Sequence, residues 1–163
     1  MVRLYLPEER PPQEHSLEQI ASAKANGCSV SGYMWLYQNA DPVEAARRAM
    51  SLAVIAGDIS RIWIDWEPYT DRTAPPVSKV LACAQEIEWD GFKAGIYTGR
   101  WFAANQPGVD LLGDYPLWTA DYSTAPASEP PLTPPLYGGW AEAAGHQWTS
   151  TPLDRNVFLS SVV

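Results

Sequence analysis

The stretch Arg61–Pro68, which reads RIWIDWEP, carries most of the information about the fold. Its isoleucines and tryptophans predict a buried strand that ends at a proline. Because successive side chains on a strand point to opposite sides, Trp63, Asp65 and Glu67 share one face. The other face is apolar throughout and carries Ile62, Ile64 and Trp66. We therefore expect a strand packed against helices on one side, with two acids on the other.

Strand-like and helix-like stretches alternate on both sides of this segment. Strands are predicted over residues 3–6, 29–37, 61–67, 93–98, 116–121, 146–149 and 156–159. Helices are predicted to start at a capping box on Ser16, at an Asp41 cap followed by a proline, and near Val77, and to stop at Gly27, Gly57 and Gly91. Such repeats indicate a parallel sheet covered by helices, either open and doubly wound or a (β/α) barrel. A proline-rich stretch over 126–135 replaces the last expected helix, so we predict an irregular second half.

Composition bounds the class of protein. With 163 residues, 46% hydrophobic and 18% charged, the chain suits one domain over residues 1–163. Eight Trp and eight Tyr exceed ordinary packing needs and suggest a site for a ligand with flat apolar faces. A net charge of −8 with scattered basic residues argues against binding nucleic acid or an anionic membrane. No apolar run approaches the roughly 20 residues of a membrane span, and Met1–Leu6 is too short for a signal peptide.

Metal and cofactor motifs are missing from the sequence. We interpret Cys28 and Cys83 as buried small apolar residues, and two histidines are too few for a metal centre or a catalytic relay. The segment Tyr97–Arg100 is neither a dinucleotide-binding nor a phosphate-binding glycine loop. No metal and no cofactor is therefore expected.

The two acids on one strand face suggest acid–base chemistry. If helices cover the apolar face, Asp65 and Glu67 point into a barrel at the carboxyl end of their strand, where barrel enzymes carry their chemistry. Two residues along a strand span about 6.6 Å, close enough for one carboxyl to raise the pKa of the other. Paired carboxylates among aromatic residues favour hydrolysis of a glycosidic bond, because sugar rings stack on Trp and Tyr. The alternative, acids that merely cap a loop, fits poorly with the apolar strand and the flanking Trp66 and Pro68.

Four ordered blocks resemble glycoside hydrolase family 25, the muramidases or lysozymes of bacteria and phages. They are DWE at 65–67, AGIYTG at 94–99, PLWTADY at 116–122, and HQWT at 146–149 followed by DRN at 154–156. The resemblance runs from about Gly32 nearly to the C-terminus. It implies an irregular, incomplete (β/α) TIM-like barrel, no cofactor, and cleavage of the β-1,4 bond between N-acetylmuramic acid and N-acetylglucosamine in peptidoglycan.

The resemblance also implies roles for individual residues. Glu67 corresponds to the general acid, Asp65 to its partner carboxylate and Asp154 to a C-terminal site aspartate. Positions that line the family's groove correspond to Tyr33, Trp35, Tyr97, Trp118, Asp121 and Gln147, although each also fits a core position. We expect Trp63, Asp65 and Glu67 to face a common cleft, with Tyr97, Trp118 and Asp154 at its rim.

The sequence departs from the family at its start. The family's first strand carries a G-x-D-x-S segment with a site aspartate, and nothing of that kind precedes Arg3. Arg3–Leu6 matches the second strand better, and 163 residues is short of the roughly 200 of a (β/α) barrel. We expect one strand–helix unit to be missing, through a late start codon, a truncated or split gene, or naturally. The open barrel edge would then favour self-association.

Two alternatives stay open at this stage. A chitinase-like pattern, D-x-x-D-x-D-x-E, is disfavoured because Ser60 and Trp63 stand where it needs aspartates. The function is either hydrolysis of peptidoglycan or glycan binding by a module that keeps the aromatic groove and has lost turnover. In both cases the expected partner is a peptidoglycan strand, and the protein would act on the cell wall, phage-encoded or secreted by other means. Whether hydrolysis would retain or invert configuration is not determined by the sequence.

Overall fold

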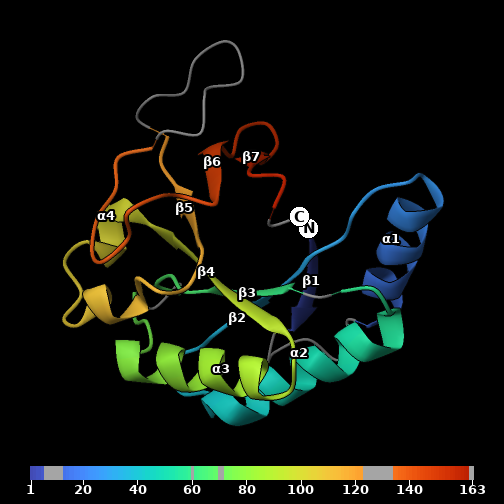
Figure 1. The fold of residues 1–163 in the computed structure, drawn as a ribbon, viewed down its shortest axis with the longest axis horizontal. Coiled ribbons are helices and arrows are strands. Elements are labelled where there is room, and N and C mark those ends of the chain that lie inside the picture. Colours follow the sequence, from blue (N-terminus) through green and yellow to red (C-terminus); the bar gives the residue numbers. More distant parts are fainter. Residues whose placement is uncertain (6–12, 60, 70–71, 123–133, 162–163) are drawn as a thin grey trace.

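The computed structural model describes residues 1–5, 13–59, 61–69, 72–122 and 134–161. Its seven strands form one sheet in the order of the sequence (Figure 1). They are β1 (Val2–Tyr5), β2 (Gly32–Trp35), β3 (Arg61–Asp65), β4 (Lys93–Gly99), β5 (Leu117–Ala120), β6 (Gly145–Thr149) and β7 (Arg155–Phe158). β1 to β6 run parallel, and β7 pairs with β6 in the antiparallel direction. Each predicted strand is present; β2, β3 and β5 are shorter than predicted, and the bounds of the others differ by one residue.

The strand order distinguishes the two architectures left open by the sequence. A doubly wound sheet reverses its strand order at a switch point, whereas here each strand pairs only with its neighbours in the chain. Among the described residues, the sheet ends at β1 and β7, which do not pair with each other. The fold is thus an open half-barrel, which confirms the incomplete (β/α) barrel. Self-association through the β1 edge stays a prediction, which a concentration series in size-exclusion chromatography would test.

Helices cover one face of the sheet (Figure 1). They are α1 (Gln13–Ala25), α2 (Pro42–Ala56), α3 (Val77–Trp89), the short α4 (Arg100–Ala103) and the 3₁₀ helix η1 (Val109–Leu112). The predicted cap of α2 is confirmed, because the Asp41 carboxylate accepts hydrogen bonds from the backbone N–H groups of Val43 and Glu44 at 2.9 Å. The predicted start at Ser16 is wrong, because α1 begins at Gln13. The Ser16 hydroxyl instead donates to the Arg3 carbonyl oxygen, which ties α1 to β1.

The two faces of the sheet carry different cores. The helix-covered face buries Met34, Ile62, Ile64, Ile96 and Leu117 against alanines and valines of α2 and α3. The opposite face, called the inner face below, carries a separate aromatic cluster of Tyr33, Trp63, Tyr97, Trp118 and Phe158. The predicted alternation along β3 is therefore confirmed, with the isoleucines under the helices and Trp63 on the inner face.

Glycine makes room for the large rings of the inner face. A Cβ on Gly95 of β4 would lie 2.5 Å from the Trp63 ring, closer than real Cβ atoms approach. The indole of Trp63 thus lies across the backbone of the neighbouring strand. Trp63 is fully buried there, so it forms packing beneath the site rather than a wall of it.

Two further expectations concern cysteines and membranes. Cys83 is buried in α3 as predicted, but Cys28 is exposed, because β2 begins only at Gly32 and leaves Cys28 in the preceding loop. Within the described ranges, none of the helices combines the length and apolar character needed to cross a bilayer.

Candidate active site

Asp65 is the last residue of β3 and one of few buried acids. Its register partners are Trp35 on β2 and Tyr97 on β4, so all three lie at the carboxyl ends of adjacent strands. Asp65 is 5% exposed, and its Oδ1 atom is buried with no hydrogen-bond partner among the described residues. A buried carboxylate oxygen without a partner is costly, which is typical of a functional position.

Trp66 fixes the geometry between the two acids. Its backbone N–H donates to the Tyr97 carbonyl oxygen at 2.9 Å, and its own carbonyl oxygen accepts from the Thr98 hydroxyl at 2.7 Å. Its indole N–H donates to the Pro75 carbonyl oxygen at 2.8 Å. Glu67, which follows, is half-buried. Three hydrogen bonds therefore hold the position after β3, two between its backbone and β4 and one from the ring to Pro75.

The two carboxyls influence each other. Burial raises the pKa of Asp65 well above its usual value, and the nearby Glu67 charge raises it further. Burial also raises the pKa of Glu67. Two interacting carboxyls titrate as a pair, so one proton is retained on the pair to higher pH than on an isolated acid. Such a pair can donate a proton while its second member stays ionised.

Aromatic and amide side chains adjoin the acids on the side of β4 to β6. The Tyr97 hydroxyl donates to Gln147 Oε1, and the Tyr122 hydroxyl lies 3.3 Å from the same oxygen. The Trp118 ring centroid lies 4.2 Å from that of Tyr97, and its indole N–H donates to Asn156 Oδ1 at 2.9 Å. Burial raises the pKa of Tyr97, and the charges of Glu67 and Asp65 add to this effect. Tyr97 therefore stays a neutral hydrogen-bond donor close to both acids.

A second aromatic group lies on the other side of Asp65. Trp35, Tyr37 and Tyr69 pack with ring centroids 4.7–6.2 Å apart. The indole nitrogen of Trp35 is buried without a hydrogen-bond partner among the described residues. Tyr33, two residues before Trp35, pairs in register with Trp63 and packs on the inner-face cluster. Of these two predicted groove residues, Trp35 thus lies nearer the acids and Tyr33 deeper.

The remaining predicted residues lie toward β5 and β7. Asp154 is exposed just before β7, and both its charge and that of Glu67 add to the burial that raises the pKa of Tyr122. Asp121 is half-buried after β5; its carbonyl oxygen accepts from His146 Nε2 at 2.9 Å. The residues proposed from the sequence thus lie on strands β2 to β6 or next to their ends, except Asp154, which precedes β7 and whose charge, like that of Glu67, acts on Tyr122.

Sequence reasoning overlooked two neighbours of the acids. Tyr122 follows Trp118 and Ala120 at a spacing of two, and this alternation was enough to place it on the inner face. Tyr69 follows Pro68 in a loop, where no periodicity applies, and only the tertiary fold brings it to Trp35.

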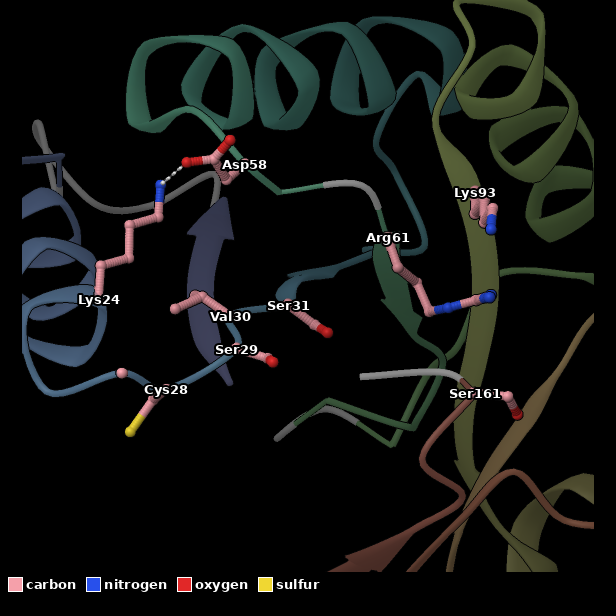
Figure 2. A pocket seen from close by; sticks show the side chains of 10 residues that line it. Lys24, Cys28, Ser29, Val30, Ser31, Asp58, Arg61, Lys93 and Ser161 are labelled. Carbon is pink, nitrogen blue, oxygen red and sulfur yellow. Dashed lines mark hydrogen bonds and ion pairs between the residues drawn. The ribbon is translucent and has the colours of Figure 1, made fainter.

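A pocket lies at the opposite, amino end of the strands. It encloses about 610 Å³ and includes Lys24, Arg61 and Lys93 (Figure 2). Two of its cations make structural contacts. Lys24 donates to the carbonyl oxygens at the end of α2. Arg61 donates to the Ala94 carbonyl oxygen, and its guanidinium lies 5.5 Å from the Trp63 ring centroid. Figure 2 shows Lys24 turned to Asp58, away from Arg61. No group of three potential metal ligands occurs among the described residues.

A half-barrel with two interacting carboxyls and aromatic side chains at its strand ends defines a domain of the carbohydrate-cleaving barrel class. A model of the family described as Glycosyl hydrolases family 25 matches residues 12–157, and the chain belongs to this family of glycoside hydrolases. No curated protein matches the chain.

Solved structures similar to the chain are cell-wall enzymes of bacteria and phages. The catalytic domain of endolysin ply40 from bacteriophage P40 of Listeria monocytogenes has a TM-score of 0.72 at 16% identity, over 91% of this chain and 76% of that one. The modular autolysin LytC from Streptococcus pneumoniae has a TM-score of 0.69 at 18% identity, over 94% of this chain. The endolysin from phage Cp-1 has a TM-score of 0.59 at 21% identity, over 85% of this chain. The chain spans only 37% of the length of LytC and 42% of the length of the Cp-1 endolysin. At such identities the likeness establishes the fold.

Thr98→Val is expected to lower both stability and turnover. Thr98 is fully buried, and valine keeps its shape but leaves the Trp66 carbonyl oxygen without this donor, which costs about 1–3 kcal/mol. Because Trp66 positions Glu67, kcat should fall and the pH profile should shift. Urea unfolding and a pH series of kcat and KM measure both effects.

The matched control is Thr119→Val. Thr119 is also fully buried, on the neighbouring strand β5, and its hydroxyl pairs with the Tyr137 hydroxyl at 2.9 Å instead of with the Trp66 carbonyl oxygen. A similar loss of stability in both variants with the same pH profile would mean that Thr98 is structural only.

Proposed function

We propose that the chain hydrolyses peptidoglycan as an N-acetylmuramidase, at the β-1,4 bond between N-acetylmuramic acid and N-acetylglucosamine. The observation that carries this proposal is the pair Asp65 and Glu67, two interacting carboxyls with raised pKa values at the carboxyl end of β3. Family membership supports it. So do two similar structures: LytC was solved with a synthetic peptidoglycan ligand, and the Cpl-1 endolysin with a peptidoglycan analogue.

Glu67 is the member of the pair that reaches solvent, and we assign it the role of general acid. Its proton passes to the glycosidic oxygen as the bond from that oxygen to the anomeric carbon breaks, so the leaving sugar departs as an alcohol. Asp65, buried beside Glu67, would in its ionised form stabilise the positive charge that develops at the sugar ring, or it would orient the acetamido group. Water then supplies the hydroxyl of the new reducing end, and its proton restores the acid.

The surrounding side chains would bind the sugar rings. Trp35 offers a buried, unpartnered N–H beside Asp65, and Tyr97 with Gln147 forms a neutral hydrogen-bonding pair on the other side. Tyr33 and Trp118 would support these groups from the inner-face cluster, while Asp121 and Asp154 would contact substrate from the side of β5 and β7. A protein with this activity would act on the bacterial cell wall.

The test is product analysis after incubation with purified peptidoglycan. Turbidity clearance reports hydrolysis, and borohydride reduction of the products reveals which sugar carries the new reducing end. We expect reduced muramic acid. Reduced glucosamine would identify cleavage of the alternate bond, and co-sedimentation without any new reducing end would favour the glycan-binding module.

A further inference from the structure

A second pocket, the β4–β5 pocket, adjoins the candidate active site. It encloses about 480 Å³ and includes Arg100, Trp101, Asn105, Asp121 and Tyr122. These residues follow the carboxyl ends of β4 and β5, the end of the sheet that carries the acids. Tyr122 belongs to both sites, because its hydroxyl also contacts Gln147. The pocket therefore shares Tyr122 with the candidate active site.

Trp101 is exposed yet held in place. It is 66% exposed, and its indole packs so closely on Gly99 that a Cβ there would clash with the indole nitrogen. Its ring centroid lies 5.9 Å from that of Phe102, which in turn lies 5.1 Å from that of the buried Trp66. A fixed, exposed indole above a pocket offers a flat apolar face of the kind on which a sugar ring stacks.

Arg100 places a cation at the same pocket. It is exposed, and none of the described carboxylates forms an ion pair with it. Its charge also affects Tyr137. Burial raises the pKa of Tyr137, and the Arg100 guanidinium opposes that shift. In a chain of net charge −8, an exposed guanidinium that no described carboxylate pairs with, beside a sugar platform, indicates a ligand that carries a carboxylate.

We propose that the β4–β5 pocket binds a muramic acid residue of the glycan strand, its ring on Trp101 and its carboxylate-bearing substituent on Arg100. This inference rests on the proposed function. N-acetylmuramic acid differs from N-acetylglucosamine by a lactyl ether, which ends in a carboxylate or in an attached peptide with carboxylates of its own. The pocket would thus set the register of the strand by distinguishing its two alternating sugars.

The experiment measures dissociation constants of soluble glycans by tryptophan fluorescence in the Glu67→Gln background, where strands stay intact. The probes are peptidoglycan strands without peptide, strands with peptide, and chitin oligosaccharides, which carry no carboxylate. Arg100→Gln should weaken binding of carboxylate-bearing strands about tenfold, in line with a solvent-exposed charged hydrogen bond, and leave chitin binding unchanged. Arg100→Lys should recover part of the loss. The two peptidoglycan probes distinguish the lactyl carboxylate from those of the peptide.

Trp101→Ala should weaken binding of all three probes by about tenfold, because stacking does not depend on charge. The matched controls are Arg48→Gln on α2 and Trp89→Ala on α3, whose side chains are exposed on helices away from the strand ends. Variants of Arg100 and Trp101 that bind like these controls, while the parent cleaves peptidoglycan, overturn this inference alone. A parent that neither binds nor cleaves any of the glycans overturns the proposed function as well.

Discussion

Replacing Glu67 by glutamine is expected to remove nearly all hydrolysis of peptidoglycan while binding and fold persist. The amide keeps the shape of the side chain but has no proton to give to the leaving sugar. Loss of a general acid typically costs about 10² to 10⁴ in rate. Turbidity clearance and reducing-end release measure the loss, and co-sedimentation with cell walls measures the binding that remains.

The control for this variant is Glu88→Gln, an exposed acid near the end of α3. It should clear cell walls at the parent rate. In the parent, activity should fall as pH rises through the raised pKa of the acid pair, because the proton to be donated is then lost. A Glu67→Gln protein that clears cell walls at the parent rate would exclude Glu67 as the acid.

Asp65→Asn is expected to have two opposite effects, a large loss of turnover and a gain in stability near neutral pH. The folded protein raises the pKa of Asp65, mainly through burial, so the folded state binds its proton more tightly than the unfolded chain does. Stability is therefore highest below the unfolded-state pKa, about 3.9, and declines as pH rises through the folded-state pKa. Asparagine cannot ionise and escapes this decline.

Thermal unfolding of parent and variant across pH measures the difference. The two melting temperatures should agree near pH 3 and diverge as pH rises, by about 2–4 °C for each kcal/mol in a domain of this size. Asp90→Asn, an exposed aspartate after α3, serves as the control and should track the parent. If the melting temperatures of Asp65→Asn and the parent depend on pH in the same way, the pKa of Asp65 is not raised in the folded protein.

The features that the sequence predicted well are those determined by near neighbours in the chain. The alternation within 61–67 placed Trp63 opposite the isoleucines, and Asp41 with its proline defined the start of α2. The helix start predicted at Ser16 was wrong, because the Ser16 hydroxyl donates to a carbonyl oxygen of β1, thirteen residues away, and does not cap its own helix. The predicted burial of Cys28 was wrong, because β2 begins at Gly32, later than the sequence pattern suggested.

The parts of the site that escaped prediction depend on contacts between distant segments. No local pattern shows that Trp101 would line a pocket shared with Tyr122, or that Tyr69 would reach Trp35. The expected strand-end position of the acids followed from a general property of parallel sheets. Their raised pKa values, by contrast, require the burial that the whole sheet supplies.

The strictly sequential order of the strands bears on when the protein becomes competent during synthesis. Each strand pairs with the one made just before it, so the sheet can grow from β1 onward as the chain leaves the ribosome. The acid pair is synthesised with β3. Gln147, which accepts the hydrogen bond of Tyr97, is synthesised only with β6. Asn156, which accepts the hydrogen bond of Trp118, is synthesised only with β7. Nascent chains would therefore carry the acids long before their surroundings. Competence would arise in a single late step, when the last two strands dock.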